Sequence, residues 1–264
     1  MDSPLFRLSH TKLSSFDQCR KKYWFAYVAN APRDPESDTP AGIVGTGVHR
    51  AMKVLCDTGS EDDGQHELDA YLRMPAHAMA GPGTEYHTTA FELFENGCKA
   101  HASIESEASW TELDTWVPWR KEGISVTTKV DRADRLDASH WQIIDWKTGK
   151  YDFGEVVDAQ LDIAHLVLRV ARRLPQEATV TAIGWNLRSG QKRTRELNRD
   201  DGAATMRYLA HRAQQLQSNT EFEATPSAAC SFCSWRAQCP DAERAEHLLE
   251  EWIEADDVFG EPEG

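Results

Sequence analysis

Two acidic residues and one lysine in the middle of the chain have the types and spacing needed for phosphodiester hydrolysis. Asp145 and Lys147 are two positions apart in WQIIDWK, which is typical of a strand, so their side chains point to the same face. Asp131 ends the alternating stretch that precedes it, and the two stretches predict a β-hairpin. If the turn comprises residues 138–140, Asp131 lies opposite Lys147, and the three side chains gather on one face.

Such a cluster suits metal-assisted cleavage of a phosphodiester. Carboxylates are hard oxygen ligands for Mg²⁺ or Mn²⁺, and the metal polarises a phosphate oxygen and activates a bound water. A neighbouring lysine orients that water and offsets the charge that develops on the phosphate. A cross-strand charge pair on a sheet surface fits the same residues, and D-x-K alone does not separate the two interpretations.

Cysteines near the C-terminus form a second group with metal-ligand spacing. They follow the pattern C-x₂-C-x₅-C at Cys230, Cys233 and Cys239. Zinc and iron–sulfur sites both need a fourth ligand, which the segment lacks. Cys19 is one candidate, whereas Cys56 and Cys98 lie among apolar residues of predicted helices, as buried free thiols do. If Cys19 completes the site, the metal joins the two ends of the chain; three unrelated thiols are the alternative.

The periodicity around these residues predicts helices alternating with strands. Alternating residues predict the strands 124–131 and 141–147, and a second hairpin follows across residues 188–190. Residues 57–69 are expected to be an exposed acidic connection. Helices are predicted over residues 12–28, from about Thr46, and over 85–107, 155–174 and 201–218.

Composition and charge exclude some classes of function. The 264 residues have an ordinary globular composition, no apolar run of membrane-spanning length, no apolar leader and no G-x-x-x-x-G-K-[ST] motif. The net charge of −14 argues against binding to nucleic acid. The charge is uneven, however, because residues 241–264 hold ten acidic residues against one basic. Residues 57–69 hold six acidic residues and no Lys or Arg. The remaining chain is nearly neutral, and its basic residues at 20–22, 169–173 and 188–195 fit either a positive groove or solvated faces.

Six motifs in order, over residues 8–240, resemble the PD-(D/E)XK nuclease superfamily in its RecB-like branch with an iron–sulfur cluster. LSHTKLSSFDQC resembles the opening helix of that branch, and GTGVHRAM resembles its G-T-x-x-H motif. VDRADRLD followed by IIDWKTGK resembles the D…D-x-K core, and Gln160-Leu161 resembles the start of Q-L-x-x-Y. CSFCSWRAQCP resembles the C-terminal cysteine signature. Arg20 replaces the usual proline after the first cysteine, and Ala164 replaces the tyrosine, with His165 beside it.

The resemblance implies a fold, an activity and roles for individual residues. The expected fold is α/β, a restriction-endonuclease-like core with a central mixed sheet of about five strands flanked by helices. The expected activity is a Mg²⁺- or Mn²⁺-dependent DNA exonuclease acting on single-stranded ends, in recombination, repair, phage or CRISPR-related processing. The implied metal ligands are His49, Asp131 and Asp145, with Lys147 as the catalytic lysine and Gln160 holding the site. The implied ligands of a [4Fe–4S] cluster are Cys19, Cys230, Cys233 and Cys239.

The same reasoning predicts how the chain is organised and what it meets. Residues 1–240 are expected to form one nuclease domain, with a helical part (1–109), a catalytic core (110–218) and a cysteine segment (226–240) that joins Cys19. The acidic tail 241–264 is either a solvated amphipathic helix or a contact for a protein partner. DNA is the expected substrate, no membrane is expected, and the location is expected to be intracellular. The alternative function is a DNA-end-processing or DNA-binding subunit with little activity alone.

Overall fold

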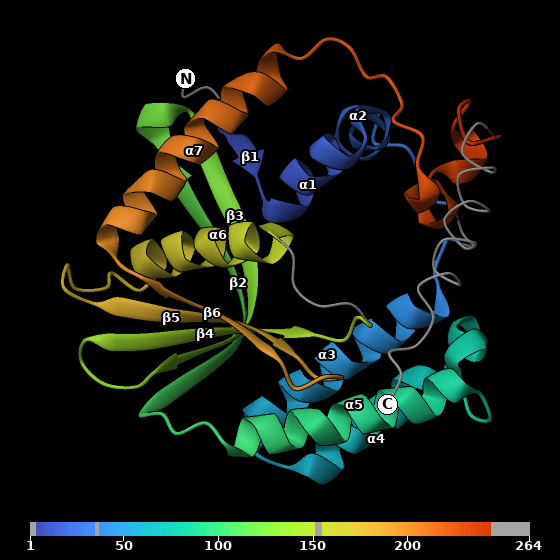
Figure 1. The fold of residues 1–264 in the computed structure, drawn as a ribbon, viewed down its shortest axis with the longest axis vertical. Helices are drawn as coiled ribbons and strands as arrows, with labels where there is room; N and C mark the ends of the chain where they lie inside the picture. The colour runs from blue at the N-terminus through green and yellow to red at the C-terminus, as the bar shows by residue number, and fades with distance from the viewer. Residues whose placement is uncertain (1–3, 35–36, 151–154, 244–264) are drawn as a thin grey trace, which may run out of the picture. The chain divides into compact units, whose positions relative to one another are not determined.

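The computed structural model describes residues 4–34, 37–150 and 155–243, and the chain divides into two units. The first unit consists of residues 1–10 and 40–214, and the second of residues 11–39 and 215–264 (Figure 1). The tail 244–264, where a partner contact was expected, lies outside the described residues. The expected division of the chain into one nuclease domain with three parts stays a prediction.

A mixed sheet of six strands organises the first unit (Figure 1). Its central order is β1-β3-β4-β5-β6, and β2 pairs with the other side of β3. The β3–β4 and β5–β6 pairs are antiparallel, as the two predicted hairpins require, whereas β4–β5 and β1–β3 are parallel. The strands are β1 (Phe6–Leu8), β2 (Ala108–Trp119), β3 (Ile124–Arg135), β4 (His140–Lys147), β5 (Thr179–Asn186) and β6 (Lys192–Leu197).

Helices cover both faces of this sheet, which confirms the expected α/β architecture. On one face, apolar residues of α3 (Pro40–Thr58), α4 (Glu61–Leu72) and α5 (Glu85–Ala102) pack against Ile144 and Trp146 of β4 and Ile183 and Trp185 of β5. On the other face, α6 (Glu155–Ala171) packs against Trp141 and Ile143 of β4. Because successive strand residues point to opposite faces, the odd-numbered residues of β4, Asp145 and Lys147 included, lie on the α6 face. The last helix, α7 (Arg199–Ser218), follows β6.

Residues 57–69 were expected to be an exposed connection, and this expectation was wrong. They include most of α4, which begins after Ser60, whose side chain accepts a hydrogen bond from the Asp63 amide at 3.1 Å. Acidic residues fill the first turn, where they interact favourably with the helix dipole. Leu68 and Leu72 are fully buried, so the charge run is the outer face of a packed helix.

In the second unit, the helix predicted over residues 12–28 is interrupted at Cys19. The segment α1 (His10–Gln18) ends there, and α2 (Arg20–Tyr23) continues into a π-helical turn, Trp24–Val28. Cys19 has extended backbone angles, φ −164° and ψ 115°. The break therefore gives this thiol a direction that a continuous helix would not give it.

Aromatic side chains hold the two chain segments of the second unit together. Phe25 stacks on Trp235 with a centroid distance of 6.5 Å, and Tyr23 stacks on Phe222 at 6.2 Å. The indole of Trp235 donates a hydrogen bond to the Ala31 carbonyl at 3.1 Å. Tyr23 and Phe25 are buried, so these two stacked pairs are part of the core of the second unit.

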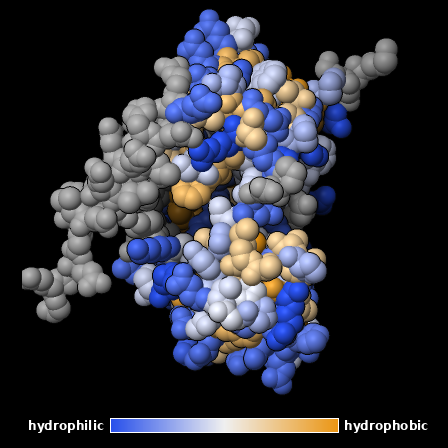
Figure 2. All heavy atoms as spheres, turned by 90° about the vertical axis from the view of Figure 1, so that its right-hand side faces the viewer, coloured by the Kyte–Doolittle hydropathy of each residue, from blue (hydrophilic) through white to orange (hydrophobic). Residues whose placement is uncertain are grey.

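The visible surface in Figure 2 is mostly hydrophilic, with apolar residues in small groups. Among the described residues, no helix is both long and apolar enough to cross a membrane.

β3 contains a buried ion pair, Arg132–Asp134, and its arginine also contacts α5. Arg132 Nε donates to both carboxylate oxygens of Asp134, at 2.9 and 3.0 Å, and both side chains are almost completely buried. The Arg132 Nη1 atom lies 2.6 Å from His101 Nδ1, which must accept this hydrogen bond because an arginine can only donate. Burial, together with the charge of Arg132, lowers the pKa of His101 and keeps its ring neutral.

We expect Asp134→Ala to lower the free energy of unfolding by about 3–5 kcal/mol, because it leaves the Arg132 guanidinium charged and unpaired in the core. The measurement is chemical denaturation of both proteins. Glu95→Ala is the matched control, since it removes an exposed i,i+4 pair with Lys99 and should change stability little. Equal losses in the two variants would contradict a stabilising role for the buried pair.

Candidate active site and cysteine pocket

The β3–β4 hairpin separates at the two predicted aspartates. The strands pair from Arg135↔Trp141 to Arg132↔Ile144, and the next step of this register would place Asp131 opposite Asp145. The ladder ends before that step. The expected register, with Asp131 opposite Lys147, was therefore wrong by two positions, but an even shift leaves all three side chains on the predicted face.

The turn explains the shift in register. The Leu136 amide donates to the His140 carbonyl at 2.9 Å across a turn of residues 137–139, one position earlier than expected. Asp137 Oδ1 accepts hydrogen bonds from the Ser139 and His140 amides at 2.7 and 2.8 Å. The Ser139 amide and the other donors of the turn lower the pKa of Asp137 to about 2. An Asx-type turn thus closes the hairpin.

The carboxylate of Asp131 accepts the backbone hydrogen bond that the separation of β3 and β4 leaves open. The Trp146 amide no longer has a partner across the ladder, and it donates to Asp131 Oδ2 at 2.9 Å. Asp131 Oδ1 lies 3.2 Å from His49 Nδ1 of α3. On the other side of β3, the regular pairing with β2 skips Glu112, a residue with φ 41°. Asp131 is therefore the point where β3 loses regular pairing on both sides.

Asp145, Lys147 and Gln160 form a closed triangle of polar contacts. Gln160, on α6, donates from Nε2 to Asp145 Oδ1 at 2.5 Å, and its Oε1 accepts from Lys147 Nζ at 2.9 Å. Lys147 Nζ lies 2.6 Å from Asp145 Oδ2, so Gln160 and Lys147 each contact one oxygen of this carboxylate. The amide of Gln160 thus fixes both charged groups.

The electrostatics of the site favour a bound cation. Burial, and then the charge of Asp131, raise the pKa of Asp145. Burial alone would lower the pKa of His49, but its hydrogen bond to Asp131 and the charges of both aspartates outweigh burial and raise it. Negative charge therefore exceeds what Lys147 neutralises. Two largely buried carboxylates that interact with each other, Asp131 and Asp145, fit a hard divalent cation.

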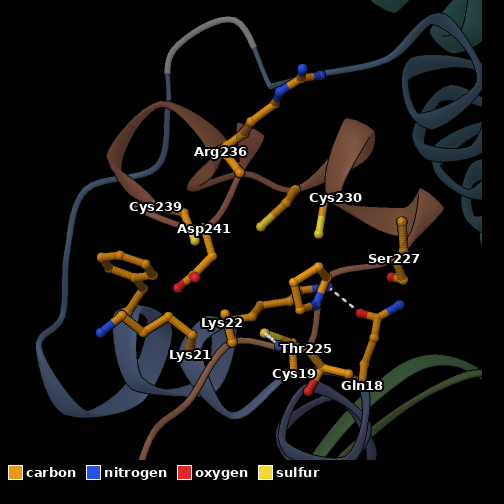
Figure 3. Close-up of a pocket in the computed structure, with 16 residues that line it drawn as sticks. Gln18, Cys19, Lys21, Lys22, Thr225, Ser227, Cys230, Arg236, Cys239 and Asp241 are labelled. Atoms are coloured by element: carbon orange, nitrogen blue, oxygen red, sulfur yellow. Dashed lines mark hydrogen bonds between the residues drawn. The ribbon is translucent and has the colours of Figure 1, made fainter. Parts of the chain in front are cut away.

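The four cysteines of the predicted cluster line one pocket, which lies within the second unit (Figure 3). The Thr225 amide donates to Cys19 Sγ at 3.4 Å. A series of short turns shapes the other segment, because the amide of Cys233 bonds to the Cys230 carbonyl and that of Arg236 bonds to the Cys233 carbonyl. The pocket is also lined by cationic side chains, those of Lys21, Lys22 and Arg236.

Cys56 and Cys98 lie elsewhere, on α3 and α5. Burial raises the pKa of both thiols to about 11, so they remain protonated and are poor ligands and nucleophiles. Both are free thiols as expected, but only Cys98 is buried and Cys56 is half-buried.

Across residues 4–34, 37–150 and 155–243, no three His, Cys, Asp or Glu side chains converge closely enough to hold one metal ion as they stand. In the candidate active site, Asp145 contacts Lys147 and Gln160, whereas Asp131 contacts His49. In the cysteine pocket, the sulfur atoms surround a shared space (Figure 3).

Two basic residues of the 188–195 group are neutralised. Arg193 donates to both carboxylate oxygens of Asp158 at 2.9 and 2.6 Å, and Arg195 lies 3.1 Å from Asp162. Both aspartates belong to α6, so these arginines fasten β6 to α6. Of the two interpretations, a structural face fits this group better than a phosphate-binding groove.

Where the Q-L-x-x-Y motif has a tyrosine, this chain has the small residue Ala164, followed by His165. Ala164 and His165 are both buried, and burial lowers the pKa of His165 to about 4. Neither ring nitrogen of His165 has a hydrogen-bond partner in the described structure. His165 therefore does not replace the missing tyrosine as a polar group of the site.

Comparisons with known proteins bear on this geometry. The sequence pattern of the PD-(D/E)XK nuclease superfamily matches residues 7–240. Among solved structures, a putative exonuclease from Eubacterium rectale is similar with a TM-score of 0.53 at 11% identity, covering 90% of this chain and 87% of its own. The protein SSO0001 gives a TM-score of 0.38 at 17% identity, covering 75% and 84%, which is too low to support a shared fold. No curated protein matches the sequence.

The match begins in β1 and ends directly after Cys239, so it contains the hairpin with Asp131 and Asp145 as well as the cysteine pocket. On this evidence, the chain belongs to the PD-(D/E)XK nuclease superfamily.

Proposed function

We propose that this protein is a metal-dependent DNA exonuclease that hydrolyses phosphodiester bonds at single-stranded ends. The observation that carries the proposal is the Asp145–Gln160–Lys147 triangle beside the Asp131–His49 pair. Exonuclease activity is supported by the name of the E. rectale neighbour, and preference for single strands by the resemblance to the RecB-like branch. We place the activity inside the cell, in recombination, repair, phage or CRISPR-related processing.

His49, Asp131 and Asp145 would hold Mg²⁺ or Mn²⁺, which supplies a polarised phosphate and an activated water. The carboxylates of Asp145 and Asp131, which interact electrostatically, fit such an ion. The Trp146 amide keeps Asp131 in place, and Gln160 holds the Asp145 carboxylate. Lys147 would donate a hydrogen bond from its ammonium group to orient the attacking water, and its charge would stabilise the negative charge on the phosphate.

We further propose that Cys19, Cys230, Cys233 and Cys239 bind a [4Fe–4S] cluster. The four thiols line one pocket, and the pocket supplies an amide donor to Cys19 and three cationic side chains. Amide donors and cations stabilise a negatively charged iron–thiolate cluster. Its role here is to hold the two segments of the second unit, which aromatic packing already joins.

The nuclease proposal is tested with linear single-stranded DNA labelled at either end, in Mg²⁺ or Mn²⁺. We expect shortening from an end, no cutting of circular single strands, and a fall of about 100- to 1,000-fold in kcat for Lys147→Ala. Lys121→Ala is the control, because it removes an exposed lysine that does not line the site. Cutting of circles would overturn exonuclease action. Folded wild type without cleavage in either metal would favour the alternative, a subunit of a larger assembly.

The cluster proposal is tested by anaerobic purification followed by absorption spectra and iron and sulfide analysis. We expect brown protein with roughly four irons per chain. Cys233→Ser should lose iron and colour, whereas Cys98→Ser, which replaces a buried thiol outside the pocket, should keep both. Colourless wild type with one zinc per chain would contradict the proposal.

A further inference from the structure

Asn186 is a buried polar residue next to the candidate active site that no motif of the sequence singles out. It ends β5 and pairs in register with Lys147 of β4. Residues in register on parallel strands point to the same face, so Asn186 lies on the α6 face together with Asp145 and Lys147. Its exposed fraction is 1%, and a buried amide at this position needs partners for its donor and its acceptor.

The two ends of the Asn186 side chain bond to different segments. Oδ1 accepts from the Arg188 and Ser189 amides at 2.8 and 3.2 Å, and this closes the β5–β6 turn. Nδ2 donates to the Gly149 carbonyl at 3.2 Å. Backbone amides can only donate and carbonyls can only accept, so these partners fix which end of the amide is oxygen.

The Gly149 bond holds the chain directly after Lys147. The Lys147 carbonyl accepts a hydrogen bond from the Leu187 amide at 2.8 Å. Together with the bond from Asn186 to Gly149, this contact anchors the end of β4 to the end of β5. On α3, an added Cβ at Gly45 would lie 3.1 Å from Thr148 Oγ1, so Thr148 has little room to move toward that helix. Lys147 is thus the last strand residue before a segment that Asn186 pins.

We propose that Asn186 is a positioning residue for Lys147: through the Gly149 carbonyl it fixes the backbone from which the lysine reaches Asp145 and Gln160. The inference rests on the proposed nuclease function, and it assigns Asn186 no contact with substrate or metal. A lysine that orients water must hold its ammonium within a fraction of an ångström, and misplacement by about 1 Å costs roughly 100-fold in rate.

The two bonds of Asn186 can be separated by substitution. Asn186→Asp keeps an oxygen for the Arg188 and Ser189 amides but loses the donor to Gly149, whereas Asn186→Ala loses both. Ser189→Ala is the matched control, because Ser189 Oγ accepts from the Gln191 amide within the same turn and the substitution keeps both bonds of the Asn186 side chain. Thermal unfolding of all four proteins measures what each change does to the fold.

The readouts are kcat, KM and the pH–rate profile on single-stranded DNA, and hydrogen exchange of the backbone at residues 147–150. We expect Asn186→Asp and Asn186→Ala to lower kcat about tenfold to a hundredfold with little change in KM, and to speed exchange in that segment. Ser189→Ala should behave as wild type. If Asn186→Asp acts by losing the bond to Gly149, kcat falls at every pH. If its new carboxylate acts only by its charge on Lys147, the pH–rate profile shifts along the pH axis instead.

Each outcome decides something different. If Asn186→Asp matches wild type in kcat and exchange, Asn186 serves only the turn, and the positioning role is wrong. A shifted pH profile with unchanged exchange contradicts it as well. If wild type cleaves no DNA but Asn186→Asp speeds exchange at residues 147–150, the anchoring stands and the nuclease proposal fails. If Asn186→Ala does not fold, Asn186→Asp, which retains the turn, decides alone.

Discussion

The candidate active site depends on one break in backbone pairing. β3 and β4 pair regularly up to Arg132 and Ile144, and beyond that step the Trp146 amide faces the carboxylate of Asp131 instead of a carbonyl. A buried amide without a partner is costly, so the aspartate stabilises the separated strands that its own position requires. The separation leaves room between the two aspartates, and regular pairing would close that room. Glu112, with its positive φ, removes regular pairing on the other side of the same residue.

The fold places the charged residues of the candidate active site where little solvent reaches them. Apolar residues of β4 and β5 bury both faces of the sheet, and the polar cluster lies at the ends of these strands. Burial, and then the charge of Asp131, raise the pKa of Asp145, although Lys147 and His49 offset part of its charge. A site left with excess negative charge after its own hydrogen bonds are made is suited to bind a cation rather than to stabilise the fold. Arg132 and Asp134 on the opposite face show the contrast, because their charges neutralise each other fully.

The sequence predicted the parts of the structure that follow from local periodicity. Alternation identified β3 and β4, and parity alone placed Asp131, Asp145 and Lys147 on one face even though the register was wrong. The register could not be predicted because it depends on how Asp137 caps its turn, a choice between adjacent positions worth little energy. β1 is only three residues long, and β2 contains Glu112 and Pro118, so neither carries a clean pattern. Asn186 was missed because its partners are backbone groups of Gly149 and the β5–β6 turn, which no spacing reveals.

Charge also constrains how a DNA substrate could be held. The chain carries a formal charge of −14, and Arg193 and Arg195, which could have formed a basic strip, are paired with aspartates of α6. Long-range attraction of a polyanion to the whole chain is therefore weak. Under the proposed function, divalent cations held by Asp131 and Asp145 would supply short-range contacts to phosphate. Substrate binding and metal binding would then be coupled, because each partner screens the charge that opposes the other.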